Sequence, residues 1–232
     1  MSSLLLHNHK FHIEIFNDDF ALLKSEEQES LQILAKALYE KKFDFIDEVI
    51  GTEVEICLKF NEAYTYDKLS LFHELNITQD DTQHSYTLPV YIHHDSDDWL
   101  QIEAHAGMNR DQYLDKLFSG QYRVSMYGFL PGFLYIQGLD KSLHIPRKST
   151  PAIQVPPGSI AVGGPYLGLY SLPSPGGWHI IGETPIKILN INHTPLMNVE
   201  AGDNIRLKNI TKEEFKTLQQ SPITLDQYNA IL

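Results

Sequence analysis

The stretch that decides the fold begins at Gly128-Phe129-Leu130-Pro131-Gly132-Phe133. Glycines around a proline allow a sharp bend and leave peptide N–H groups uncovered. The simpler alternative is a tight turn whose phenylalanines pack in the core. Ten of the chain's 14 glycines lie between Gly128 and Gly182, and ten of its 12 prolines lie between Pro131 and Pro195. Short strand-like segments alternate with these turns, and this pattern predicts a closed β-barrel or a sandwich.

The residues before this stretch have a different pattern, in which strands and helices alternate. The segments 11–16 and 20–24 predict a β-hairpin, and leucines at helical spacing predict a helix over 26–41. The other elements predicted here are strands at 43–50, 53–60 and 86–92 and a helix at 64–75. This order favours a split β-α-β sheet with helices on one face. We place the domain boundary between residues 1–85, the α+β lobe, and 86–232, the barrel domain.

Elements are also predicted at the margins of the barrel domain. Asp98 is placed to cap a helix over 99–106, and Asn109 with Gln112 forms a capping-box pattern before a helix over 110–118. Near the C-terminus, residues 186–191 predict a strand and residues 212–219 a helix.

Composition and charge exclude several classes of protein. The formal net charge of −12 argues against a general binder of nucleic acid or of anionic membranes. No apolar run approaches the roughly 20 residues needed to cross a bilayer, and the first residues carry no cleavable signal pattern. The single cysteine, Cys57, cannot form an intrachain disulfide and is interpreted as a packed thiol. We therefore expect a cytoplasmic protein.

The charge is unevenly distributed. Residues 121–210 carry seven Lys or Arg against four Asp or Glu, so this region could hold a small anion, although chance composition explains the same excess. Within it, Arg147 lies between the rigid residues Pro146 and Pro151. A guanidinium fixed in this way could bind carboxylate or phosphate oxygens. The alternative is a basic turn that faces solvent.

Two further glycine-rich blocks are candidates for a binding site. In the segment 155–165, the pair Gly163-Gly164 permits close approach of a ligand or of a neighbouring strand. It is not a phosphate loop, because no Gly-Lys-Ser/Thr follows. In the segment 174–185, a Gly-Gly turn precedes Trp178, a residue suited to a pocket wall. His179 could act as an acid or base near neutral pH, although a lone histidine beside tryptophan more often has a structural role.

No metal-binding motif is found. His93 and His94 are adjacent, so on a strand they would point to opposite faces and make a poor pair of ligands. Ser125, Ser159 and Ser174 lack a Gly-x-Ser-x-Gly elbow.

Taken together and in this order, the blocks resemble the signature of a known family. That family contains the sporulation kinase inhibitor, the B-type subunit of 5-oxoprolinase and allophanate hydrolase subunit 1. The matching segments are Gly128–Phe133, Pro146-Arg147, Val155–Ser159, Ser174–Gly182, and Ala201-Gly202-Asp203 with Ile205-Arg206. The N-terminal half matches only in its plan of strands and helices.

The resemblance implies an α+β fold, with a ferredoxin-like N-terminal lobe and a C-terminal cyclophilin-like β-barrel. It also implies a partner, a homologue of the C-type 5-oxoprolinase subunit, with which a joint active site would open the lactam of 5-oxoproline at the expense of ATP. ATP would be shared with that partner, and this chain would be inactive alone. Arg147 and His179 would be the catalytic residues. The residues that would bind the small anionic amide substrate are Gly132, Phe133, Gly163, Gly164, Gly176, Gly177 and Trp178.

The sequence also departs from the family pattern. Where the family has a histidine, an arginine, a Gln-Thr pair and a basic or polar residue, this chain has Phe118, Ala152, Tyr166-Leu167 and Glu183. Polar groups are lost while the glycines remain. The departures therefore favour a second hypothesis, a regulatory protein that inhibits a sensor histidine kinase, or else a changed substrate. A peptidyl-prolyl isomerase-like binder is a third hypothesis, and it rests on the barrel fold alone.

Overall fold

The computed structural model describes residues 2–17, 19–63, 66–75, 77, 83–192 and 195–232. The chain divides into two compact units, Met1–Thr82 and Gln83–Leu232. Each unit has its own buried apolar core.

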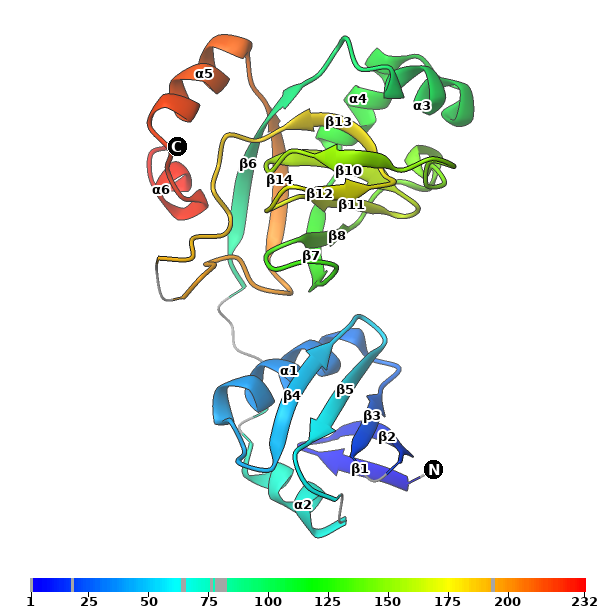
Figure 1. The fold of residues 1–232 in the computed structure, drawn as a ribbon, viewed down its shortest axis with the longest axis vertical. Helices are drawn as coiled ribbons and strands as arrows, with labels where there is room; N and C mark the ends of the chain where they lie inside the picture. Colours follow the sequence, from blue (N-terminus) through cyan, green and yellow to red (C-terminus); the bar gives the residue numbers. More distant parts are fainter. Residues whose placement is uncertain (1, 18, 64–65, 76, 78–82, 193–194) are drawn as a thin grey trace. The chain divides into compact units, whose positions relative to one another are not determined.

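The first unit is built on a five-stranded antiparallel sheet in the order β1-β2-β3-β5-β4 (Figure 1). Its strands are β1 (Ser2–Leu6), β2 (His9–Phe16), β3 (Phe20–Lys24), β4 (Ile46–Gly51) and β5 (Glu55–Phe60). Helix α1 (Gln28–Lys41) joins β3 to β4, and β5 lies between those two strands. This is the split β-α-β arrangement that the sequence predicts.

The N-terminal hairpin is an addition that the sequence did not reveal. In the β-α-β-β-α-β order of a ferredoxin-like lobe, a strand after the second helix would lie beside β3. Here β2 takes that place and pairs with β1 on its other side. His7 and Asn8, between β1 and β2, both have positive φ angles. Two such residues form the turn that matches the twist of a two-residue hairpin.

The core of the first unit lies between the sheet and its helices. Leu31, Leu34 and Leu38 form one buried stripe of α1 because they recur every three or four residues. They pack with alternate residues of β2, β3 and β5 and with the short helices α2 (Tyr66–Ser70) and η1 (Leu71–Glu74).

The second unit is a closed β-barrel with the strand order β10-β11-β8-β7-β14-β6-β13. The bounds are β6 (Ser85–Ile92), β7 (Tyr122–Tyr127), β8 (Leu134–Gln137), β10 (Ser159–Gly163), β11 (Tyr166–Leu169), β13 (His179–Glu183) and β14 (Asn204–Asn209). All neighbours pair in the antiparallel sense except β14 and β6, which are parallel. The α+β class and the barrel predicted from the sequence are confirmed.

Helices cover part of the barrel. Trp99 and Ile102 of α3 (Asp98–Ala106) and Leu117 of α4 (Arg110–Ser119) belong to the same buried cluster as the barrel interior. The capping box of Asn109 and Gln112 is present at α4. Helices α5 (Lys212–Gln220) and α6 (Leu225–Asn229) follow β14, and α6 was not predicted. Within the described part of the chain, the helices are too short or too polar to cross a bilayer.

The strand predicted at residues 186–191 is wrong. The described part of this segment forms an irregular loop in which the N–H of Asn190 donates to the carbonyl of Leu196. The barrel needs no strand from this segment, because β13 pairs directly with β6 through Gly182 and Ile92. The loop instead contributes to the surface beside α6.

A small two-stranded sheet is separate from the barrel. Strands β9 (Ala152–Val155) and β12 (Ser174–Gly176) pair with each other. Leu134 of β8 points into the barrel core, whereas its neighbour Phe133 belongs to a separate buried cluster with Val155 and Trp178. This outer cluster sets the position of the candidate site.

Candidate functional site

A cluster of aromatic rings lies on the outer face of β8, β10 and β11. Phe133 meets Tyr170 and Trp178 edge-to-face, with ring centroids 4.9 and 5.7 Å apart. Tyr135 meets the Trp178 ring edge-to-face at 5.6 Å. Such pairs contribute about 0.5–1.5 kcal/mol each beyond the burial of their area. The buried indole of Trp178 is therefore held in a fixed place.

Glycines give these rings the room they occupy. A Cβ built on Gly163 would lie 2.4 Å from the ring of Trp178, and one on Gly168 would lie 2.7 Å from the rings of both Phe133 and Trp178. A Cβ on Gly176 would lie 2.4 Å from the hydroxyl of Tyr170. The group that closely approaches Gly163 is thus the Trp178 ring of this same protein chain. The predicted contacts of Phe133, Gly163 and Gly176 with a substrate remain predictions.

Arg147 lies at the edge of this aromatic cluster. Its side chain is exposed, and its guanidinium carbon is 5.9 Å from the centroid of the Trp178 ring. A guanidinium at this distance is attracted to the ring face. The pKa of the neighbouring Tyr170 is raised, mainly by burial, and the charge of Arg147 opposes that rise. Arg147 and Trp178 therefore place a cation above an apolar ring. The roles predicted for them in catalysis and substrate binding remain predictions.

The segments that carry Arg147 and Trp178 are bonded to each other. The N–H of Lys148 donates to the carbonyl of Gly177 at 2.7 Å. The ammonium of Lys148 lies 2.6 and 2.7 Å from the two carboxylate oxygens of Asp98, and the N–H of Ile180 donates to the same carboxylate at 2.7 Å. The prediction that Asp98 caps α3 is wrong, because Asp98 is the first helical residue and its side chain turns to Lys148 instead.

His179 is buried beside these bonds, with 2% of its surface exposed. Its Nε2 donates to the carbonyl of Pro146 at 3.1 Å, and its Nδ1 has no hydrogen-bond partner among the described residues. Burial lowers the pKa of the imidazole below 6.5, so it is neutral at physiological pH. A catalytic role for His179 remains a prediction.

The remaining predicted glycines differ in how much space surrounds them. They are Gly132, Gly164 and Gly177. Gly132 and Gly164 have φ angles of +77° and +60°, which favour glycine. A Cβ on Gly164 would meet nothing within 4 Å, and one on Gly177 would meet ordinary contacts no nearer than 3.7 Å. The N–H of Gly164 already donates to the carbonyl of Ile145. This amide is therefore not a free donor, and its predicted role in substrate binding remains a prediction.

A comparison with protein families matches residues 11–198 to one model, described as carboxyltransferase domain, subdomain C and D. The chain belongs to this carboxyltransferase-domain family.

Relatives and solved structures agree with this assignment. The B-type subunit of 5-oxoprolinase from Escherichia coli O157:H7 is 37% identical over 109 residues, which cover 47% of this chain and 50% of that protein. The protein of the same name from Haemophilus influenzae is 42% identical over 85 residues, covering 37% of this chain and 40% of that protein. The matches thus span half or less of these relatives. The crystal structure of K. lactis urea amidolyase matches with a TM-score of 0.67 and 16% identity, covering 95% of this chain and 16% of that protein. This likeness shows the fold alone.

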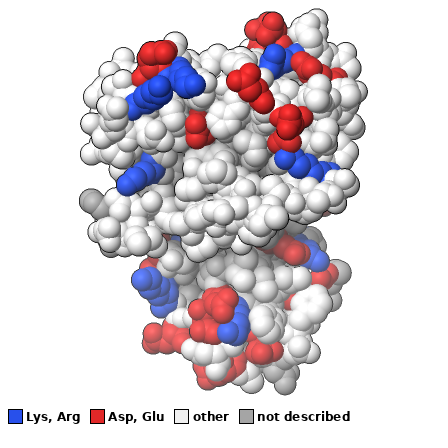
Figure 2. All heavy atoms as spheres, turned by 45° about the horizontal axis from the view of Figure 1, so that its top comes forward, with Lys and Arg blue, Asp and Glu red and all other residues white. Residues whose placement is uncertain are grey.

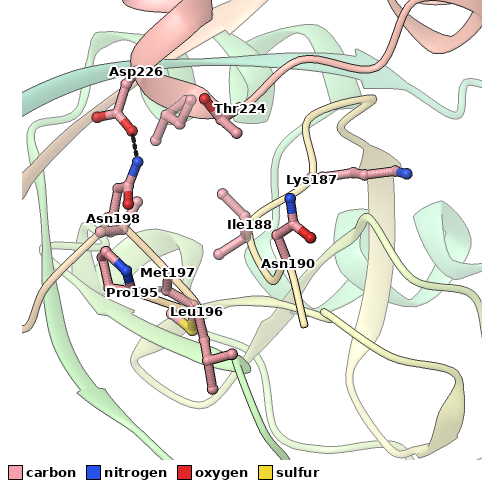
Figure 3. Close-up of a pocket in the computed structure, with 11 residues that line it drawn as sticks. Lys187, Ile188, Asn190, Pro195, Leu196, Met197, Asn198, Thr224 and Asp226 are labelled. Carbon is pink, nitrogen blue, oxygen red and sulfur yellow. Dashed lines mark hydrogen bonds between the residues drawn. The ribbon is translucent and has the colours of Figure 1, made fainter. Parts of the chain in front are cut away.

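The structure of this carboxyltransferase-family chain also contains a hollow that the sequence did not predict. It has a volume of about 310 Å³ and is lined by the loop from Lys187 to Val199 and by residues 224–226 (Figure 3). Asn198 donates a hydrogen bond to Asp226 on one wall, while Lys187 points away. The hollow adjoins the Gly132 turn, since a Cβ there would lie 3.3 Å from the sulfur of Met197. It was missed because the loop was predicted as a strand.

Charged side chains of both signs are interspersed on the face of the second unit that Figure 2 shows. Uncharged atoms cover much of the middle of this face. This face therefore carries no broad basic field of the kind that attracts polyanions.

Proposed function

We propose that this carboxyltransferase-family chain is one component of a 5-oxoprolinase-type complex. In the proposal, it acts with a homologue of the C-type 5-oxoprolinase subunit and uses ATP to open the lactam ring of 5-oxoproline. One observation carries the proposal for the site: the exposed guanidinium of Arg147 lies 5.9 Å from the centroid of the buried Trp178 ring. The names of the relatives from E. coli and H. influenzae support the substrate class.

The chemistry of the reaction fits a cation beside an apolar wall. Opening an unstrained lactam is uphill, so the amide oxygen is first phosphorylated by ATP. This transfer releases ADP. One water then adds to the activated carbon and the C–N bond breaks, which leaves an acyl phosphate on the opened chain. A second water hydrolyses the acyl phosphate, so that inorganic phosphate leaves and glutamate is the product. The substrate carries a carboxylate, and negative charge shifts toward the amide oxygen as it attacks. Arg147 would bind one of these groups at the edge of the aromatic cluster.

The partner would complete the site. Nothing in the motifs of this chain resembles a phosphate loop, so the proposal assigns the main contacts to ATP to the C-type homologue. This chain would then contribute substrate binding and charge stabilisation from the outer face of its barrel, and it would have no turnover alone.

Copurification followed by an activity assay tests the proposal. The chain is coexpressed with the C-type homologue encoded nearest to it and with any third component, and ATP hydrolysis is measured with and without 5-oxoproline. We expect hydrolysis that depends on 5-oxoproline only in the assembled complex. A stable complex whose ATP hydrolysis ignores 5-oxoproline would refute the assigned substrate.

The Arg147→Ala variant tests whether Arg147 takes part in the reaction. We expect at least a hundredfold loss of turnover, comparable to the removal of one donor to a developing oxyanion, with the folded state unchanged because the side chain is exposed. Arg206→Ala is a matched control, because Arg206 is also exposed and lies on β14, across the barrel from β10. Wild-type turnover in Arg147→Ala would remove Arg147 from the site.

A second candidate is the regulatory protein that inhibits a sensor histidine kinase. The packing of Ala152 and Tyr166 against the aromatic cluster favours it, because the family pattern has polar residues at these positions. The discriminating measurement is autophosphorylation of a neighbouring histidine kinase with and without this chain. Inhibition at equimolar protein, without any 5-oxoproline-dependent ATP hydrolysis, would favour this candidate over the first.

A further inference from the structure

Several bonds hold the segment that carries Arg147, and two residues beside the site are bonded to one buried carboxylate, that of Asp98. Arg147 itself is exposed, and nothing in its own contact with the Trp178 ring would hold the peptide backbone at this edge. The adjacent Lys148 is bonded to Asp98 through its ammonium, and Ile180, two residues after Trp178, is bonded to Asp98 through its N–H. One carboxylate thus adds a link between the arginine segment and the tryptophan segment, beside their direct bonds from the N–H of Lys148 to Gly177 and from His179 to Pro146.

Asp98 is itself firmly held. Its side chain is 12% exposed, and it belongs to the first turn of α3. The next residue, Trp99, is buried in the barrel core and donates its indole N–H to the carbonyl of His93 at 2.8 Å. The carboxylate is therefore anchored to the barrel rather than to either of the segments that it joins.

An ion pair of this kind fixes the positions of its two side chains more than it stabilises the folded state. The desolvation of two buried charges offsets most of their attraction, so the net gain in folding free energy is small. The bonds nevertheless fix direction, because both carboxylate oxygens are used and the distances to Lys148 are 2.6 and 2.7 Å.

We propose that Asp98 is a positioning residue, which places the guanidinium of Arg147 over the Trp178 ring by holding Lys148 and the N–H of Ile180. The positioning role stands on geometry, and only its effect on substrate binding rests on the proposed function. Side chains that act on a reacting group need such support to stay within about half an ångström of their working geometry.

The test of positioning compares Asp98→Asn with Asp97→Asn by ¹H–¹⁵N NMR. Asp97 is the neighbouring residue and is exposed, so its variant removes the same charge without the bonds. Arg147→Ala supplies the reference, because it shows where the indole N–H signal of Trp178 moves when the guanidinium is absent. We expect Asp98→Asn to move the Ile180 amide proton upfield and the Trp178 indole signal toward the Arg147→Ala position, and Asp97→Asn to leave both in place.

A Trp178 signal that stays at its wild-type position in Asp98→Asn, while the Ile180 amide moves, would overturn the proposal. If Asp98→Asn does not fold, the Lys148→Met variant tests the same ion pair by removing the ammonium that binds Asp98. Loss of the Lys148 bond should move the Trp178 signal in the same direction, and an unchanged signal in a folded Lys148→Met variant would equally overturn the proposal.

Kinetics of the assembled complex separate this inference from the proposed function. With 5-oxoproline as the substrate, Asp98→Asn should raise KM by roughly tenfold or more and lower kcat by a smaller factor, while Asp97→Asn changes neither. A wild-type KM for Asp98→Asn, in a complex whose KM is raised by Arg147→Ala, would overturn the proposal. If the wild-type complex does not act on 5-oxoproline, the proposed function fails, and the NMR comparison alone decides whether Asp98 positions Arg147.

Discussion

Replacing Gly163 with alanine should displace Trp178 and destabilise the second unit. The added Cβ would lie 2.4 Å from ring atom Cδ2 and 2.5 Å from Cγ of Trp178. Non-bonded carbon atoms need about 3.5 Å, so the ring or the strand must shift by about 1 Å. The ring cannot retreat freely, because Phe133 and Tyr135 meet it edge-to-face at 5.7 and 5.6 Å.

The expected cost follows from two opposing effects. Overpacking of this kind costs about 1–3 kcal/mol, whereas replacing a glycine with alanine restricts the unfolded chain and returns about 0.4–1 kcal/mol. The backbone of Gly163 has no positive φ angle, so no further strain arises. The net loss should be about 1–2 kcal/mol. For a unit of this size, the melting temperature should fall by about 2–8 °C.

Tryptophan fluorescence during urea unfolding measures this loss. The chain has two tryptophans, Trp99 and Trp178, and both lie in the second unit, so their emission reports on that unit alone. Gly177→Ala is the matched control. Its Cβ would lie no closer than 3.7 Å to its neighbours and its φ is not positive, so its free energy of unfolding should change by less than about 0.5 kcal/mol.

Two results would refute this reasoning. A Gly163→Ala protein with the wild-type urea midpoint and emission spectrum would mean that the ring adapts without cost. A Gly177→Ala protein as unstable as Gly163→Ala would mean that the effect comes from loss of glycine in general, and that contact with Trp178 is not its cause.

Two other predictions concern stability away from that contact. Because burial lowers the pKa of His179 below 6.5, the unfolded chain takes up its proton first as the pH falls, so stability should decrease below about pH 6.5, by at most about 1.4 kcal/mol per pH unit from this group. His179→Asn should flatten that part of a plot of urea midpoint against pH, and an unchanged slope would contradict the assignment. Asn229→Ala should lower the free energy of unfolding by about 1–3 kcal/mol, because the Asn229 side chain accepts from the N–H of Thr87 at 2.7 Å and donates to its carbonyl at 3.2 Å. A midpoint within error of wild type would show that water replaces both bonds.

The barrel could be predicted because its signals are local. The turns at Gly132 and Gly158, both with positive φ, are written in the sequence as glycines beside prolines. The alternating apolar residues of β6 and β14 likewise give a period of two. The layer of β9 and β12 could not be predicted in this way, since each strand is very short and only Val155 and Gly176 are buried in it.

The sequence drew attention to Arg147 and Trp178, but it did not show the bonds that hold their segments, and the binding roles predicted for these residues remain predictions. Arg147 and Trp178 were chosen from their flanking prolines and glycines, and the structure brings them together. Asp98 was assigned to a helix cap, because a sequence shows an acid before a helix but not its distant partners. Those partners lie 50 and 82 residues away, and only the fold brings them within hydrogen-bond distance.

The departures from the family pattern fall in different surroundings, and this decides which of them bear on the site. Phe118 packs against the barrel core and Leu167 lies within it, so both serve packing. Glu183 lies 3.1 Å from His93 at the barrel wall, where it can form an ion pair when the histidine is protonated.

Ala152 and Tyr166 differ, because both pack against the aromatic cluster beside Arg147 and Trp178. Tyr166 meets Tyr135 edge-to-face at 5.8 Å, and Tyr135 in turn meets Trp178. The family pattern would place an arginine and an amide at these two positions, so the surroundings of Arg147 have lost polar groups and gained apolar surface. In the proposed function, recognition of an anion at this edge would therefore depend more heavily on Arg147, and a substrate with a larger apolar face would suit this site better than it would suit the family pattern.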